Sequence, residues 1–222
     1  MKILAFDCAG AQCAAAVSID GETAAEAGIR SERGHAQLLM PLLVRLAAEA
    51  GLTLRGFDRF AVTTGPGSFT GIRVALAAAR GLALGADKPV VGITNFAAIA
   101  ADAAQAGIPA PRLLIAIESR RAECFAQLFD PAGRPLAEPA MLAPEAIPAW
   151  LGPGAVALAG DAARRVLPGL PGATGMGARF DMADPAIVAR LAAYGPAEDA
   201  PRPFYLRAPD AVPAKTRLRA AP

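Results

Sequence analysis

The chain has 222 residues, which leaves room for one large domain or for two small lobes with an apolar core in each. Its apolar fraction is 54%, much of it alanine, yet no apolar run is uninterrupted for the roughly 18 residues of a membrane span, so we expect no membrane association. The formal net charge of +2 is too small to predict a broad nucleic-acid-binding face.

Short apolar runs that end at turn residues predict strands in the first half of the chain. They cover residues 2–6, 13–19, 22–29, 59–64 and 90–93. The turn pair Asp20-Gly21 separates the second run from the third and predicts a hairpin there. Three consecutive strands therefore open the chain.

Helices are predicted between these strands. Leucines recur at three- and four-residue spacing over residues 38–46 until Gly51 stops the helix, with Pro41 expected in the first turn or at a kink. Ser68 or Thr70 caps a second helix that runs to about residue 85, and a third helix begins near residue 94.

Proline and glycine at residues 107–111 indicate a boundary between two lobes. We therefore predict an N-terminal lobe over residues 1–108 and a C-terminal lobe over residues 109–222. The second lobe opens with a strand at residues 113–117. Later elements are weaker: a strand and turn over residues 156–161, and a short helix through Leu191 that Asp184-Pro185 begins.

The second half repeats the opening of the first. The run LAFD at residues 4–7 is followed six residues after its acid by Cys13, and the run IAIE at residues 115–118 is followed at the same distance by Cys124. A Gly-containing turn follows in both halves. The repeat predicts an α/β fold from a duplicated β-β-β-α unit with mixed sheets, because helices on the faces of such sheets bury these elements.

The cysteines and the N-terminus bear on the cellular compartment. Asp7 arrives before any apolar stretch long enough for a signal peptide, so we expect a cytoplasmic protein. Cys8, Cys13 and Cys124 have no metal-ligand spacing, and a reducing cytoplasm keeps thiols free. We expect neither a disulfide nor a zinc site, and the single histidine, His35, argues against a metal held by several histidines.

The sharpest motif is GPGSFTGIR at residues 65–73, where a strand passes into a helix. It has no P-loop lysine, and its third glycine is one place late for a dinucleotide fingerprint. Two interpretations stay open: a tight turn with close packing, or an anion site at the helix N-terminus. Candidate nucleotide- or anion-binding residues are Asp7, Gly65, Gly67, Ser68 and Glu118.

This motif, with GLALG at residues 81–85, resembles the signature of the bacterial TsaB (YeaZ) family of tRNA threonylcarbamoyladenosine biosynthesis proteins. ILAFD at residues 3–7, His35 with the following leucines, AIESR at residues 116–120 and FYLR at residues 204–207 also resemble that family. The resemblance implies a two-lobed actin-like ATPase (ribonuclease H-like) fold. The chain departs from the family pattern at three positions, Cys8, Gln37 and Glu118. At the last of these the family pattern has an aspartate.

The resemblance implies a scaffold subunit without catalytic residues or a cofactor of its own. It would bind TsaD, which carries the metal and transfers the threonylcarbamoyl group, and the ATPase TsaE, or form a homodimer when alone. Contact with tRNA would be indirect, through the complex. The local excess of basic residues near the end of the sequence leaves two interpretations open, a solvated tail or an assisting surface that contacts tRNA through Arg207, Lys215 and Arg217. The implied partner interface consists of His35, Leu38, Leu39, Leu42, Leu43, Leu46, Thr70, Arg73, Val74, Ala77 and Ala78.

Three other classes of function compete with this interpretation. An ATP-dependent phosphotransferase would use Asp7 and Glu118, but the loop CAGAQ at residues 8–12 offers no Lys, Ser or Thr to a phosphate. An RNA-binding module would need exposed aromatic side chains for stacking, and only 5% of the chain is aromatic. A peptidase triad would have to use His35, and no Gly-x-Ser-x-Gly elbow is present.

Overall fold

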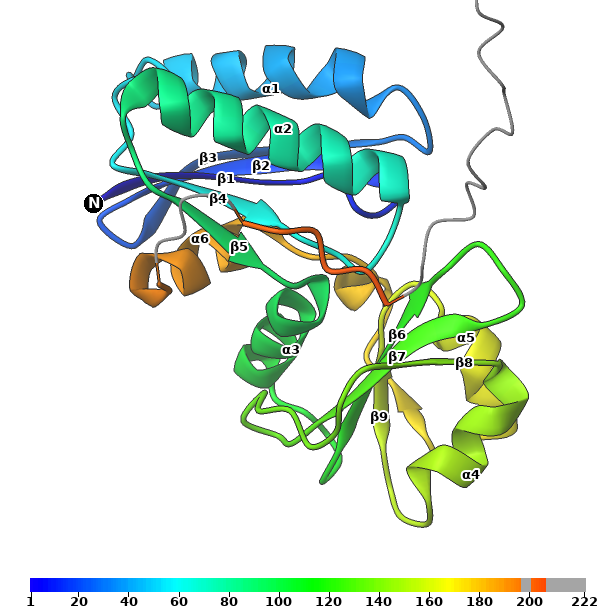
Figure 1. Cartoon of the computed structure of the whole chain (residues 1–222). Helices are drawn as coiled ribbons and strands as arrows, with labels where there is room; N and C mark the ends of the chain where they lie inside the picture. The colour runs from blue at the N-terminus through cyan, green and yellow to red at the C-terminus, as the bar shows by residue number, and fades with distance from the viewer. Residues whose placement is uncertain (197–200, 207–222) are drawn as a thin grey trace, which may run out of the picture.

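The computed structural model describes residues 1–196 and 201–206, which form two lobes with a five-stranded mixed sheet in each (Figure 1). The N-terminal sheet has the order β3-β2-β1-β4-β5. Its strands are β1 (Lys2–Asp7), β2 (Gln12–Ile19), β3 (Glu22–Arg30), β4 (Arg59–Thr63) and β5 (Val90–Ile93). β1 is central, antiparallel to β2 and parallel to β4.

The C-terminal sheet repeats this arrangement in the order β10-β9-β6-β7-β8. Its strands are β6 (Leu113–Glu118), β7 (Cys124–Phe129), β8 (Ala140–Leu142), β9 (Ala157–Ala159) and β10 (Thr174–Gly175). β6 is antiparallel to β7 and parallel to β9, as β1 is to β2 and β4. The predicted α/β fold with a duplicated β-β-β-α unit is therefore confirmed.

Helices α1 (His35–Glu49) and α2 (Phe69–Ala86) cover one face of the N-terminal sheet (Figure 1). Their apolar stripes enclose the largest core cluster with Leu4 and Phe6 of β1. α1 begins at His35, one turn earlier than predicted, so Pro41 lies inside the helix and not in its first turn. Ser68 caps α2, because its hydroxyl accepts a hydrogen bond from the Gly71 amide at 3.3 Å.

By length and composition α2 is apolar enough to cross a membrane, with a mean hydropathy of 1.3. In the fold one side of this helix lies against β4 and α1, and Ile72, Ala75, Leu76 and Ala79 are buried there. Core helices of folded domains have the same composition. The packing of α2 accounts for the apolar residues on its buried side.

Helix α6 (Pro185–Tyr194) covers the opposite face of the N-terminal sheet, where Val188 and Ala192 pack against Ile3 and Ala5. In residues 201–206, the Pro201 carbonyl and Tyr205 contact this lobe, whereas Phe204 and Leu206 pack against the core of the second lobe. The predicted division at residue 108 is therefore wrong for residues 185–194, because α6 packs on the first sheet although it follows the strands of the second lobe. α3 (Asn95–Ala106) lies between the lobes and contributes mainly to the core of the second (Figure 1).

Short helices cover the outer face of the C-terminal sheet, where the sequence predicted loops. They are η1 (Pro144–Ala146), α4 (Ile147–Leu151), α5 (Ala163–Val166) and η2 (Leu167–Gly169), and η3 (Ala178–Phe180) lies near α3. η1 and α4 have a proline in the first turn, where its missing amide costs no hydrogen bond. The prolines that suggested loops therefore lie in the first turns of helices.

Candidate functional site

Asp7 ends β1 at the junction of the lobes, and its carboxylate is fully buried. Oδ1 accepts hydrogen bonds from the Ala9 amide at 3.0 Å, the Thr63 hydroxyl at 2.5 Å and the Asn95 side-chain amide at 3.2 Å. Oδ2 accepts one from Gln12 Nε2 at 3.2 Å. The carboxylate thus ties the β1–β2 loop, the end of β4 and the start of α3 together through neutral donors.

The glycine-rich loop lies against the β1–β2 loop. A Cβ at Gly67 would lie 2.3 Å from the carbonyl oxygen of Ala9, and one at Gly71 would lie 1.9 Å from that of Cys8. The Ser68 amide donates to the Ala9 carbonyl at 2.7 Å. These contacts support the close-packing interpretation of the motif, because the glycines make room for backbone and not for a ligand.

Gly65 has a similar role, since its amide donates to Asn95 Oδ1 at 3.0 Å and its carbonyl accepts from the Asn95 amide. An anion site at Gly65, Gly67 and Ser68 stays a prediction. It gains no support from these contacts, which already engage the amides of Gly65 and Ser68.

Glu118 ends β6 but does not occupy the place in its lobe that Asp7 occupies. Leu114 and Ala116 of β6 belong to the core under α4 and α5, and Glu118 continues that face of the strand. Its carboxylate pairs with Arg165 of α5 at 2.5 Å. Its amide donates to Asp161 Oδ1 at 2.7 Å.

On β1, in contrast, Leu4 and Phe6 are the residues under α1 and α2, so Asp7 lies on the opposite face of its strand, toward α3. The structure does not bring the Asp7 and Glu118 carboxylates to equivalent positions. Their predicted joint action on a phosphate therefore has no geometric support.

A cleft of about 290 Å³ lies between the β1–β2 loop and the end of β6. Burial, followed by the nearby charges of Glu118 and Asp181, raises the pKa of Asp161 to about 6. The cleft is lined by Ala9, Gly10, Ala11, Glu32, Ser68, Ile117, Glu118, Arg120 and Asp161. With three acids and one base in this lining, the cleft disfavours a polyphosphate.

No group of three or more His, Cys, Asp or Glu side chains within residues 1–196 and 201–206 is arranged to hold a metal ion.

The predicted interface residues divide into two groups. His35, Leu39, Leu42, Leu43 and Leu46 are buried in the protein's own core, and the Nε2 of His35 donates to the Ser31 carbonyl at 2.8 Å. The prediction that these five side chains contact a partner is wrong, because α1 turns them into the core. Thr70, Arg73 and Ala77 are exposed, and Leu38, Val74 and Ala78 are half-buried.

Sequence reasoning missed the apolar side chains that these helices do expose. Met40 and Val44 of α1 are 38% and 52% exposed, and Phe69 and Leu84 of α2 are 40% and 86% exposed. Met40 and Val44 are four residues apart, so helical spacing relative to the buried leucines could have found them. We call these four residues the outer apolar set.

The motif FYL at residues 204–206 lies beside the start of α2. The Tyr205 ring stacks on Phe69 with 5.2 Å between centroids, and Arg73 Nε donates to the Tyr205 hydroxyl at 3.1 Å. The Phe204 amide donates to the Thr64 carbonyl at 2.8 Å. Arg207, Lys215 and Arg217, proposed for tRNA contact, lie outside the described residues.

Comparison with known proteins decides the family. The model of the family described as "TsaD: tRNA N6-adenosine threonylcarbamoyltransferase" matches residues 23–170. The chain belongs to this family. The predicted resemblance to TsaB (YeaZ) is confirmed by the relatives described next.

The tRNA threonylcarbamoyladenosine biosynthesis protein TsaB of Escherichia coli is 35% identical over 125 residues, which are 56% of this chain and 53% of that protein. The chain thus spans about half the length of the curated relatives it matches. YeaZ from Pseudomonas aeruginosa superposes with a TM-score of 0.74 at 27% identity, covering 87% of this chain and 91% of that one.

A second solved structure, described as an uncharacterized protein with similarity to peptidase YEAZ from Pseudomonas aeruginosa, has a TM-score of 0.78 at 28% identity. It covers 93% of this chain and 99% of that chain. The similarity therefore extends over both lobes.

Proposed function

We propose that the protein is a non-catalytic subunit in the synthesis of tRNA N6-threonylcarbamoyladenosine, which binds and activates TsaD together with TsaE. The similarity to TsaB, a biosynthesis protein by name, supports the pathway. The observation that carries the binding role is the outer apolar set on α1 and α2, which leaves large apolar side chains exposed on two adjacent helices.

The proposed interface combines this set with small residues of α2. Val44 and Leu84 project large apolar groups, and Thr70, Ala77 and Gly81 leave exposed backbone that another helix can approach closely. The partner we propose is TsaD, whose family model matches this chain and whose own helices would meet this face. A homodimer through the same face would be isologous.

Several finer points belong to the same proposal. The chain needs no cofactor, and ATP and a metal ion belong to TsaD and TsaE. The buried Asp7 carboxylate, engaged by four neutral donors, and the pairing of Glu118 with Arg165 support this division, because neither acid is free for phosphoryl transfer. The compartment we propose is the cytoplasm, where a partner in tRNA modification would act.

The test is reconstitution with a matched pair of variants. TsaD, TsaE, tRNA, threonylcarbamoyl adenylate and ATP are combined with the wild-type chain, with Val44→Asp or with Leu136→Asp, and modified adenosine is measured. Val44 and Leu136 are 52% and 53% exposed, but Leu136 lies in the other lobe. We expect Val44→Asp to reduce activity at least about tenfold, since burying an unpaired charge at an interface costs several kcal/mol.

Leu136→Asp should retain wild-type activity. Equal activity of the two variants would show that Val44 and its face of α1 do not contact the partner. Modification without the chain, together with no complex with TsaD by gel filtration, would overturn the proposed function and favour the phosphotransferase alternative.

A further inference from the structure

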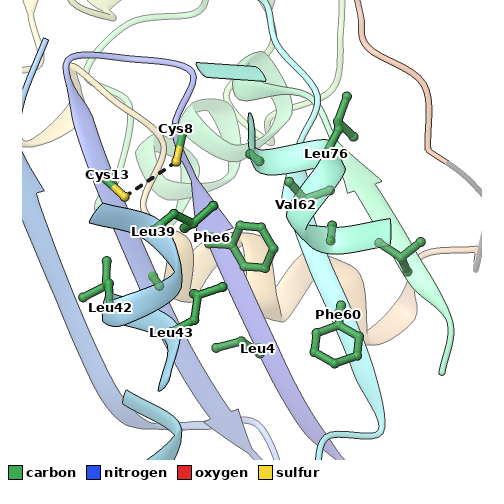
Figure 2. Packing of buried hydrophobic residues seen from close by; sticks show 14 of the residues in the cluster. Leu4, Phe6, Cys8, Cys13, Leu39, Leu42, Leu43, Phe60, Val62 and Leu76 are labelled. Carbon is green, nitrogen blue, oxygen red and sulfur yellow. Dashed lines mark hydrogen bonds between the residues drawn. The ribbon is translucent and has the colours of Figure 1, made fainter. Parts of the chain in front are cut away.

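Cys8 and Cys13 lie opposite each other at the end of the β1–β2 hairpin. Asp7 pairs with Ala14 across the two strands, so the next facing positions are Cys8 and Cys13. Their Sγ atoms are 3.7 Å apart, and Figure 2 shows the two sulfurs directed toward one another above Phe6 and Leu39. Both side chains are fully buried free thiols.

We propose that Cys8 and Cys13 form a reversible modification site, at which a small hydroperoxide oxidises the pair to an intramolecular disulfide. A disulfide needs its sulfurs about 2.05 Å apart and its Cβ atoms about 3.8 Å apart. Directly opposed positions in an antiparallel pair have Cβ separations of about 4.5 to 5.5 Å, so a small approach of the strand ends with side-chain rotation closes the bond. This inference is independent of the proposed function.

The geometry assigns different parts to the two thiols. The Cys8 S–H donates to Cys13 Sγ, and this hydrogen bond lowers the pKa of Cys13 against the opposing effect of burial. The same pairing raises the pKa of Cys8, with burial adding to the effect. We therefore assign Cys13 as the attacking sulfur, and Cys8 as the sulfur that keeps its proton until the second step.

In the first step the Cys13 thiolate attacks one oxygen of the hydroperoxide, the O–O bond breaks, and a sulfenic acid forms as hydroxide or alkoxide leaves. In the second step Cys8 sulfur attacks the sulfenic sulfur, the S–O bond breaks, and water leaves with the Cys8 proton. With hydrogen peroxide, two thiols and one peroxide give one disulfide and two waters. The two sulfurs lose two electrons, and the peroxide oxygens gain them.

Because both sulfurs are buried, the size of an oxidant limits its access to them. The side of the pair toward the sheet core is closed by α1 and α2, and the loop residues Gly10, Ala11 and Gln12 are half-buried above it. Hydrogen peroxide needs only a small displacement of this short loop to reach the sulfurs, whereas a bulky disulfide such as oxidised glutathione needs a larger one. We expect hydrogen peroxide to react at least about tenfold faster than glutathione disulfide at equal concentration, because access limits the second reagent.

Cys124 is an internal control. It is equally buried on β7, but the residue opposite it is Glu118. Burial raises its pKa to about 11, and no second thiol lies within the hairpin. Cys124 should stay reduced under conditions that oxidise the pair.

The test counts thiols in the full chain. Reduced protein is treated with hydrogen peroxide, denatured and alkylated, and we expect the alkylated cysteines to fall from three to one and to return to three with dithiothreitol. The tryptic peptide of residues 3–30 contains both cysteines of the pair and should lose two hydrogens. The Cys124→Ala variant should form the same bridge, and Cys13→Ala should not.

Three alkylated cysteines after treatment of the wild-type chain would overturn the proposal, and so would a product that carries only added oxygen at residues 3–30. Covalent dimers linked through Cys124 would overturn it as well. The wild-type count needs no variant, so a Cys13→Ala chain that fails to fold leaves the test intact.

Discussion

The two lobes share one topology but differ in how their first hairpin pairs, and this difference decides what their acids do. The sequence distance from acid to cysteine is six residues in both lobes. In the first lobe Asp7 faces Ala14, whereas in the second Glu118 faces Cys124. The second hairpin loop is therefore shorter by one residue at that point.

Because side chains alternate along a strand, a shift of one residue moves an acid to the other face of its sheet. Asp7 lies toward α3 and is buried among neutral donors, and Glu118 lies toward α5 and pairs with Arg165. The residue of the second lobe that lies on the face equivalent to that of Asp7 is Ile117, which belongs to the core beside α3. Equal spacing in a sequence thus does not guarantee equal geometry.

The largest expected effect tests a feature that the lobes share, a glycine packed against backbone at or directly after the central strand. A Cβ at Gly71 would lie 1.9 Å from the Cys8 carbonyl oxygen, and one at Gly160 would lie 2.0 Å from that of Ala116. We expect Gly71→Ala and Gly160→Ala each to lower the free energy of unfolding by about 3 kcal/mol or more, since backbone must move. Urea unfolding measures this.

Gly81→Ala is the matched control, because it lies on the same helix as Gly71 with no atom within 4 Å of the added Cβ. It should raise the free energy of unfolding by about 0.5 to 1 kcal/mol, as alanine favours helix. Destabilisation of all three variants to a similar degree would contradict the close-approach explanation.

The next effect distinguishes the two acids. Asp7→Asn keeps the shape of the side chain but replaces one acceptor oxygen with an NH₂ group. This group would face another donor in either orientation: Gln12 Nε2 at the Oδ2 position, or the three groups that donate to Oδ1. Gln12 cannot turn its amide to help without losing its bond to the Ala183 carbonyl. We expect a loss of about 2 to 3 kcal/mol in the free energy of unfolding, the cost of buried unpaired donors, measured by urea titration at neutral pH.

An Asp7→Asn chain as stable as wild type would mean that the network is not required for folding. The Gln12→Ala variant supplies the control, because it removes the conflicting donor. In that background Asp7→Asn should cost less than it does alone, as a double-mutant cycle would reveal.

A smaller, pH-dependent effect belongs to the second lobe. Burial raises the pKa of Asp161 from its ordinary 3.8 to about 6 in the folded chain. The folded state therefore binds the proton more tightly than the unfolded state, and this contribution to stability falls as pH rises from about 4 to 6. We expect a loss of roughly 2 kcal/mol across this window, after a discount for partial exposure.

Asp161→Asn tests the assignment, because its oxygen can still accept the hydrogen bond from the Glu118 amide while the titration is removed. Thermal or urea unfolding measured between pH 4 and 7 should show a flatter profile for the variant than for wild type. Parallel profiles would show that another group causes the pH dependence.

Much of the first lobe could be predicted from the sequence, because its strands and helices are long and periodic. The strand predicted at residues 90–93 has the observed bounds, and Asp184 caps α6 as expected. The short strands β8 and β10 and the helix α5 were missed, since two to four residues carry no period. The sequence also did not predict the register of strand pairing, so it did not predict that Cys8 and Cys13 lie opposite each other.

The smallest expected effect completes the comparison of the acids. Glu118→Gln removes the charge opposite Arg165, but both side chains are partly exposed, at 28% and 35%, and solvent screens the pair. We expect a loss below about 1 kcal/mol in the free energy of unfolding, which shrinks further when salt weakens the attraction. Urea unfolding at low and high salt measures it, with Asp7→Asn as the salt-insensitive counterpart. A loss at Glu118 as large as that at Asp7 would mean that the two lobes depend equally on their acids, despite the shift in register.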